Sequence, residues 1–156
     1  MRVVGIDLGS ICSGYGIVEK NDHNFSCINW GEIKLPRKNS LAKRLYMLYD
    51  SMEEIFKAYT PHEVVIEDPY VGSNVKTAFV LGQVKGVTVL LAQKLSLPVF
   101  AYSPLEIKQA VVGYGRADKG QVRAMVQRLL NLPDMPGQHA ADALAAALCH
   151  LQRLRL

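Results

Sequence analysis

The sequence predicts one α/β domain, residues 1–156, built on a mixed sheet of five strands flanked by α-helices. Five short runs rich in β-branched or aromatic residues are typical of strands. Longer stretches follow the third, fourth and fifth of them, with apolar residues at three- and four-residue steps, the period of helices. No internal repeat or linker divides the chain. The predicted strands are residues 3–7, 15–18, 25–35, 64–67 and 97–102.

The first three strands are expected to form an antiparallel meander, because short connections suit antiparallel neighbours. The first strand ends on a charged residue, Asp7, and a glycine-rich turn leads into the second. The third ends at Pro36, which cannot donate a ladder hydrogen bond. Since an unpaired buried carboxylate costs several kcal/mol, Asp7 is expected to meet a metal, a metal-bound phosphate or a lysine.

A helix is predicted over residues 41–59, with Ser40 as its N-cap and Pro61 as its stop. The next strand, 64–67, is a short apolar run of the kind found in buried parallel strands, and it ends on Glu67. Asp7 and Glu67 are therefore expected at adjacent strand ends. Asp68 follows directly, but side chains alternate along a strand, so only Glu67 is expected to face the same site.

A second helix is predicted over residues 74–94, where Ala78, Gly82 and Gly86 fall on one side. Internal glycines cost a helix about 1 kcal/mol each, so a close neighbour is expected there. Packing against the sheet and packing against a second copy of the chain both remain open.

Three further helices complete the prediction. Ser103 and Pro104 open a short helix that contains Lys108. A glycine-rich loop with Arg116 then precedes a helix over residues 119–130 that begins at Lys119. An alanine-rich helix over residues 138–153 ends the chain.

Composition narrows the function classes. The chain of 156 residues is too short for the two lobes of an actin-like ATPase. No apolar run approaches the roughly 20 residues of a membrane span, so a soluble, cytoplasmic protein without a membrane partner is expected. Three cysteines without a Cys-x-x-Cys spacing argue against disulfides and structural zinc. A net charge of +4 with acids reserved for a metal suggests a polyanionic partner.

The candidate site combines Asp7, Glu67, His139 and Asp142. The last two are three residues apart near the start of the final helix, so they share a face. An oxygen-rich set of this kind suits magnesium or manganese. Taken alone, the turn after Asp7 fits a ribonuclease H-like nuclease, an actin or sugar-kinase type ATPase, or an ordinary capped hairpin.

Several motifs, in order, make the sequence resemble the RuvC family of bacterial Holliday-junction resolvases over almost its whole length. They are Gly-Ile-Asp7-Leu-Gly-Ser with Gly-Tyr-Gly, the strand ending Ile-Glu67, Ala78-x-x-x-Gly-Gln-x-x-Gly-Val, Lys108-Gln-x-Val-Val-Gly-x-Gly with Lys119, and Ala-Ala-Asp142-Ala-Leu-Ala. The resemblance implies a ribonuclease H-like fold and a homodimer that nicks four-way DNA junctions symmetrically with two magnesium ions per site, for which manganese can substitute. It also implies contact with the RuvA and RuvB branch-migration proteins.

The same resemblance assigns roles to single residues. Asp7, Glu67 and Asp142 fall on the family's metal-binding acids, and His139 falls where many members carry a fourth acid and some carry histidine. The DNA-binding residues it implies are Tyr70, as a stacking aromatic, and the basic residues Lys108, Arg116 and Lys119. A nuclease for flaps or hybrids and a catalytically weak junction-binding protein remain the alternatives.

Overall fold

A five-stranded mixed sheet forms the centre of the computed structural model, which describes residues 1–22, 24–68 and 72–154. The strand order is β3-β2-β1-β4-β5. The first three strands pair antiparallel, whereas β4 runs parallel to β1 and β5 parallel to β4. The predicted mixed sheet is therefore confirmed. Its strands are β1 (Arg2–Asp7), β2 (Cys12–Asn21), β3 (Asn24–Lys34), β4 (Glu63–Glu67) and β5 (Val99–Tyr102).

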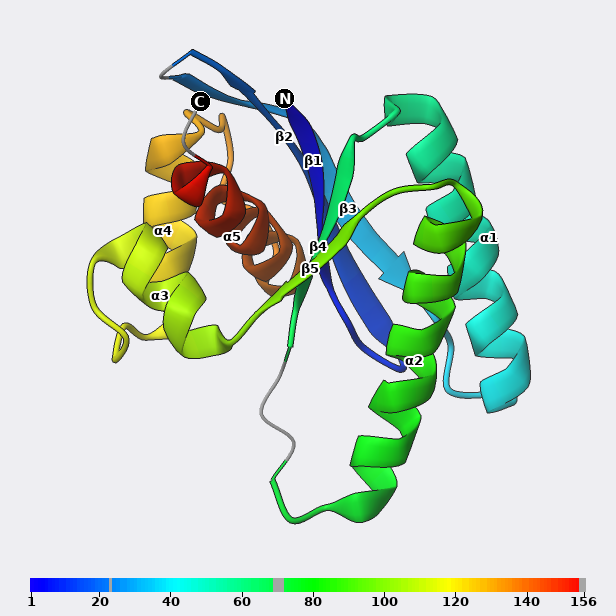
Figure 1. Cartoon of the computed structure of the whole chain (residues 1–156). Coiled ribbons are helices and arrows are strands. Elements are labelled where there is room, and N and C mark those ends of the chain that lie inside the picture. Colours follow the sequence, from blue (N-terminus) through cyan, green and yellow to red (C-terminus); the bar gives the residue numbers. More distant parts are fainter. Residues whose placement is uncertain (23, 69–71, 155–156) are drawn as a thin grey trace.

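Helices cover both faces of the sheet, two on one side and three on the other (Figure 1). The helices α1 (Leu41–Tyr59) and α2 (Val75–Lys94) share a core with Val4, Ile6 and Ile66. On the opposite face Val3, Val18 and Val65 pack with the three remaining helices. These are α3 (Pro104–Val112), α4 (Lys119–Leu129) and α5 (Gln138–Arg153).

The predicted cap of α1 forms, and capping boxes open α3 and α4. The Ser40 side chain accepts a hydrogen bond from the Lys43 backbone N–H at the start of α1. Ser103 and Asp118 each form a capping box, with Glu106 and Gln121 respectively. The helices carrying Lys108 and Lys119 thus begin at fixed points, because each cap satisfies backbone donors that the helix cannot.

Three strand boundaries differ from the prediction by more than one residue: both ends of β2, which extends to Asn21 and not only to Val18, and the start of β5. β2 begins at Cys12, not Tyr15, because Cys12, Ser13 and Gly14 pair with β3 although these residues have weak strand preference. β5 begins at Val99, not Leu97, since Pro98 has no N–H to donate to the ladder.

Helix α5 lies directly on β1 and β2 because glycines face it. A Cβ atom at Gly5 would lie 1.9 Å from the carbonyl oxygen of Ala143, and one at Gly14 would lie 2.0 Å from that of His139. The alanines of α5 are fully buried on the same face. The close neighbour of these sheet glycines is therefore a helix backbone, which brings the start of α5 over the end of β1.

The outer face of α2 has no neighbour among the described residues. No heavy atom lies within 4 Å of a Cβ placed at Gly82 or Gly86, and Phe79 and Leu90 are 71% and 64% exposed. Packing within the chain thus does not explain the two glycines. By length and composition α2 would suffice to cross a membrane, contrary to the expectation that no stretch would, although an apolar helix awaiting a protein contact passes the same test.

Candidate active site

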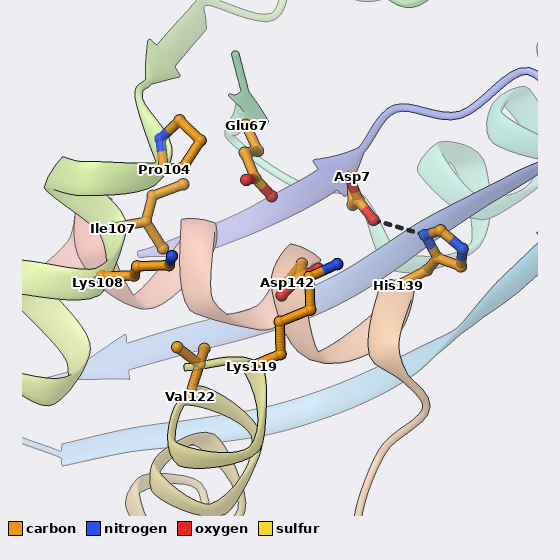
Figure 2. A pocket seen from close by; sticks show the side chains of 9 residues that line it. All are labelled: Asp7, Glu67, Pro104, Ile107, Lys108, Lys119, Val122, His139 and Asp142. Atoms are coloured by element: carbon orange, nitrogen blue, oxygen red, sulfur yellow. Dashed lines mark hydrogen bonds and ion pairs between the residues drawn. The ribbon is translucent and has the colours of Figure 1, made fainter. Parts of the chain in front are cut away.

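A pocket of about 380 Å³ opens where β1 and β4 end and α5 begins. Carboxylates enter it from both strands and from the helix, and Lys108 and Lys119 reach toward it from α3 and α4 (Figure 2). The lining residues are Asp7, Glu67, Pro104, Ile107, Lys108, Lys119, Val122, His139 and Asp142.

Parallel pairing of β1 and β4 places the two strand-end acids side by side. Ile6 lies opposite Ile66, so Asp7 and Glu67 are the next residues on neighbouring strands. Asp68 instead forms an ion pair with Lys85 of α2 at 2.9 Å and does not line the pocket. The alternation of side chains along β4 therefore selects Glu67, as the sequence predicts.

The turn after Asp7 is held by hydrogen bonds from three directions. The backbone N–H of Gly9 donates to the Ser13 hydroxyl, which donates back to the Gly9 carbonyl, each at 3.0 Å. Arg44 of α1 donates to the carbonyl of Ser10, and the Leu35 N–H donates to that of Ile11. Ser13 is fully buried, so this turn is a fixed support for Asp7.

Two side chains at the start of α5 orient the acids. His139 Nδ1 lies 2.7 Å from Asp7 Oδ2, across 132 residues of sequence. Gln138 Nε2 donates to both carboxylate oxygens of Asp142, at 2.9 and 3.0 Å. Asp7 and Asp142 thus each have one partner from α5.

Burial and like charge raise the pKa of the strand-end acids. Burial is the main reason that the pKa of Asp7 rises to about 6; the nearby Asp142 adds to the rise, and the hydrogen bond from His139 opposes it. The pKa of Glu67 rises to about 7, first through burial and then through Asp7 and Asp142, with Lys119 and Lys108 opposing. A cation in the pocket would relieve this repulsion.

The donor set fits a hydrated, oxygen-loving dication. Among the described residues, no three His, Cys, Asp or Glu side chains lie close enough together to enclose one ion. A zinc site needs such an enclosure, whereas magnesium keeps several waters and takes one or two carboxylates with substrate phosphate oxygens. Carboxylates that are spread around one pocket therefore suit magnesium better than zinc.

The family model for RuvC, crossover junction endodeoxyribonuclease, matches residues 3–150. The chain belongs to the RuvC family. RuvC of Caldanaerobacter subterraneus subsp. tengcongensis is 47% identical over 96% of this chain and 92% of its own length. RuvC of Cupriavidus necator is 43% identical over 96% of this chain and 83% of its own.

Solved structures agree with the family assignment. Thermus thermophilus RuvC in complex with a Holliday junction substrate matches with a TM-score of 0.90 and 31% identity, over 97% of this chain and 93% of that one. The yeast mitochondrial Holliday junction resolvase Ydc2, at 18% identity and a TM-score of 0.64, shares the fold. RuvC family members are metal-dependent nucleases that act on DNA, so the ATPase reading of the Asp7 turn is excluded.

The structure places two of the predicted DNA-binding residues in the pocket and a third outside it. Lys108 and Lys119 line the pocket. Arg116 is exposed on the loop between α3 and α4 and is not among the lining residues. Tyr70 lies outside the described residues.

Two residues near the site were missed by sequence reasoning. Gln138 holds Asp142, and its position four residues earlier on a helix was a usable signal. Arg123 of α4 donates from Nε and Nη2 to the carbonyl of Pro136, at 3.1 and 2.9 Å, just before α5 starts. No pattern in the sequence indicates that contact, because it depends on how α4 and α5 pack.

Proposed function

We propose that this chain is a structure-selective endodeoxyribonuclease that resolves Holliday junctions by paired symmetric nicks, in homologous recombination and DNA repair. The observation that carries the proposal is the pocket in which three carboxylates from β1, β4 and α5 face two lysines, in a chain of the RuvC family. Hydrolysis at each nick joins a water oxygen to phosphorus and breaks the bond to the 3′ oxygen. The products are a 5′-phosphate and a 3′-hydroxyl, which a ligase can seal.

Asp7, Glu67 and Asp142, together with His139, are the residues that would hold metal. We infer two magnesium ions per site, with manganese able to replace them, because the donors are mainly hard oxygens spread around the pocket. Bound there, two such ions would activate the attacking water and stabilise the charge on the leaving oxygen. The raised pKa values of Asp7 and Glu67 support this assignment, since buried, mutually repelling carboxylates favour a dication.

The lysines of the pocket serve the substrate. Lys108 and Lys119 come from two capped helices, and in the metal-free protein their charges favour ionised Glu67. With metal bound, both ammonium groups become available to the phosphates on either side of the cut. Arg116, an exposed cation outside the pocket lining, extends the DNA contact, and we infer that Tyr70 contributes a stacking aromatic.

A homodimer would provide the two active sites that the two cuts require. Two coordinated nicks in strands of like polarity need two sites related by twofold symmetry. The unpartnered face of α2 suits this role, because Phe79 and Leu90 expose apolar surface and the glycines between them allow close approach of a second helix. Phe79→Arg should convert the dimer to a monomer in analytical ultracentrifugation, with the thermal shift on metal addition unchanged.

The proposed DNA substrate also suggests the cellular location and the partner proteins. We infer that residues 1–156 act as one nuclease domain, in the cytoplasm, on junctions delivered by the RuvA and RuvB branch-migration proteins. The partnership with RuvA and RuvB rests on the family resemblance alone.

Cleavage of a synthetic four-way junction, compared with duplex, flap and RNA–DNA hybrid substrates of the same sequence, tests the proposal. We expect magnesium-dependent nicks at symmetric positions in two opposite strands of the junction, with ends that ligate directly. Faster cleavage of flaps or hybrids would instead support a nuclease of another specificity. Junction binding without any cleavage would support a non-catalytic binding protein.

A further inference from the structure

A second basic surface lies beyond the pocket, on the connection from β3 to α1. Residues 34–44 contain five basic residues and no acid. One of them, Arg44, has a role inside the chain, since it donates to the Ser10 carbonyl. The other four are exposed, and none has an ion-pair partner within the described ranges 1–22, 24–68 and 72–154. We call them the β3–α1 basic surface: Lys34, Arg37, Lys38 and Lys43.

Strand register places Lys34, the first residue of this surface, on the same face of the sheet as Asp7. Asp7 lies opposite Gly14, and Gly14 lies opposite Glu32. This face is the one that α5 covers, because a Cβ at Gly14 would meet the His139 carbonyl. Lys34 is two residues beyond Glu32, so its side chain points to the same face.

The distance from Asp7 to Lys34 is short on the scale of DNA. Two strand spacings of about 4.8 Å and two residues of about 3.4 Å put the two Cα atoms about 12 Å apart. Along one DNA strand this spans about four nucleotides at 3.4 Å each. A strand with a phosphate in the pocket would therefore reach Lys34 within a few nucleotides.

The connection after Lys34 adds positive charge at the same end of the sheet. Figure 1 shows the β3–α1 connection at the end where β1 and β4 terminate. Arg37 and Lys38 lie in the turn closed by the hydrogen bond from Asn39 N–H to the Pro36 carbonyl. α1 then begins with no acid in its first turn, so its N-terminal partial positive charge is not cancelled locally.

One acid lies close to this surface. Glu32 occupies the same face two residues before Lys34, and its carboxylate lies against Gly137 at the start of α5. The surplus charge of the surface therefore rests on Arg37 and Lys38, exposed on the connection after β3, and on Lys43, exposed in the first turn of α1. The pocket thus has cations on two sides, with Lys108 and Lys119 on α3 and α4 and this surface beyond β2 and β3.

We propose that Lys34, Arg37, Lys38 and Lys43 bind the phosphate backbone of a junction arm within about five nucleotides of the scissile phosphate. This proposal rests on the proposed function of the pocket. This contact depends on the charge of the DNA backbone and not on the base sequence. Long, exposed basic side chains on a turn are not held rigidly enough to recognise the edges of particular bases. The contact positions the arm so that the scissile phosphate enters the pocket.

A pair of matched double variants tests the proposal. Arg37→Gln with Lys38→Gln removes two charges from the surface. Lys57→Gln with Arg128→Gln removes two exposed charges elsewhere, near the C-terminal ends of α1 and α4. Junction affinity of the wild type and both variants is measured over a series of salt concentrations, in calcium to prevent cutting, and hydroxyl-radical footprints are recorded in parallel.

We expect the surface variant alone to bind more weakly, with the slope of log affinity against log salt lower by about 1.8, because each phosphate contact contributes about 0.9. Protection within about five nucleotides of the cut should disappear in that variant and persist in the control. Equal affinities, slopes and footprints for both variants would overturn the proposal and leave the surface to another partner, such as an acidic protein. In that case wild-type cleavage of the junction would show that the proposed function still holds, whereas a wild type that neither binds nor cuts junctions would overturn both.

Discussion

Glu67 illustrates how a single carboxylate is prepared for a cation. Burial and the neighbouring Asp7 and Asp142 raise its pKa to about 7, while Lys119 and Lys108 only partly compensate. Near neutral pH the ionised form is therefore costly in the metal-free protein. A bound dication removes that cost, so metal binding and folding stability are linked at this residue.

Glu67→Gln should stabilise the metal-free protein at alkaline pH. The pKa of Glu67 is higher in the folded state than the ordinary value of 4.5, so its destabilising effect is absent below about pH 4.5 and grows as pH rises to about 7. At pH 8 the variant should exceed the wild type by on the order of 2 kcal/mol in free energy of unfolding, since one pKa unit corresponds to about 1.4 kcal/mol. Denaturant unfolding in a chelator at pH 5 and pH 8 measures this. A variant less stable than the wild type at pH 8 would show that Glu67 is not under electrostatic strain.

His139→Ala should shift the acid limb of the pH–activity profile upward. The hydrogen bond and charge of His139 lower the pKa of Asp7, so without them Asp7 stays protonated to higher pH and binds metal less well. More metal should partly restore activity, and His139→Asp, which supplies an oxygen ligand, should remain active. Superimposable profiles for the wild type and the two variants would assign His139 a purely structural place beside the pocket.

At this scale the sequence predicted the side chains that bear charge but not the ones that orient them. Asp7 and Glu67 are conspicuous because each ends an apolar strand. Gln138 and Arg123 are ordinary polar helix residues, and their contacts depend on side-chain rotamers and on how two helices pack. Such contacts leave no periodic signal in the chain.

At the scale of elements, the placement of α5 depends on glycines in the sheet, which have no side chain to hold the helix away. The Cβ-free surfaces of Gly5 and Gly14 let the helix backbone touch the sheet, and this contact brings His139 and Asp142 over the end of β1. The site geometry is thus a consequence of the close packing between α5 and the sheet.

Gly14→Ala should impair both stability and cutting. The added methyl group would lie 2.0 Å from the His139 carbonyl oxygen, so α5 must shift away at the position of the site. Overpacking of this kind costs about 1 to 3 kcal/mol. Gly31→Ala is the control, because its methyl group meets the outer end of the Tyr15 ring, which can move. Thermal unfolding and junction cleavage should separate the two, and equal losses would contradict this account of α5.

Helices and strands were largely predictable from period and caps, and the exceptions have physical causes. The start of β2 depends on pairing with β3, a strand that follows it in the sequence, and local preference does not encode such pairing. The glycines of α2 predicted a close neighbour, but the sequence could not say whether that neighbour lies within the chain. The open face of α2 shows that the described residues do not supply it.

At the scale of the whole molecule, charge is arranged as an acidic pocket between basic elements. Lys108→Ala and Lys119→Ala should each weaken junction binding and lower the salt slope by about 0.9, since each removes one phosphate contact. The cut should stay at the same nucleotide, because backbone contacts carry no sequence information. Fluorescence anisotropy at several salt concentrations, with mapping of the product ends, checks both points. An unchanged slope in both variants would move the DNA path away from α3 and α4.

The central claim is that the acids of the pocket cut the junction, whereas basic residues in and around the pocket bind it. Binding and cleavage of one four-way junction by the wild type and Asp7→Asn, measured on the same preparations in magnesium, test it most directly. The account predicts that Asp7→Asn binds the junction within about threefold of the wild type, because shape and basic surfaces are retained, and that cleavage falls by at least about a thousandfold. Loss of binding in parallel with cleavage by a correctly folded variant, or continued cleavage, would contradict it.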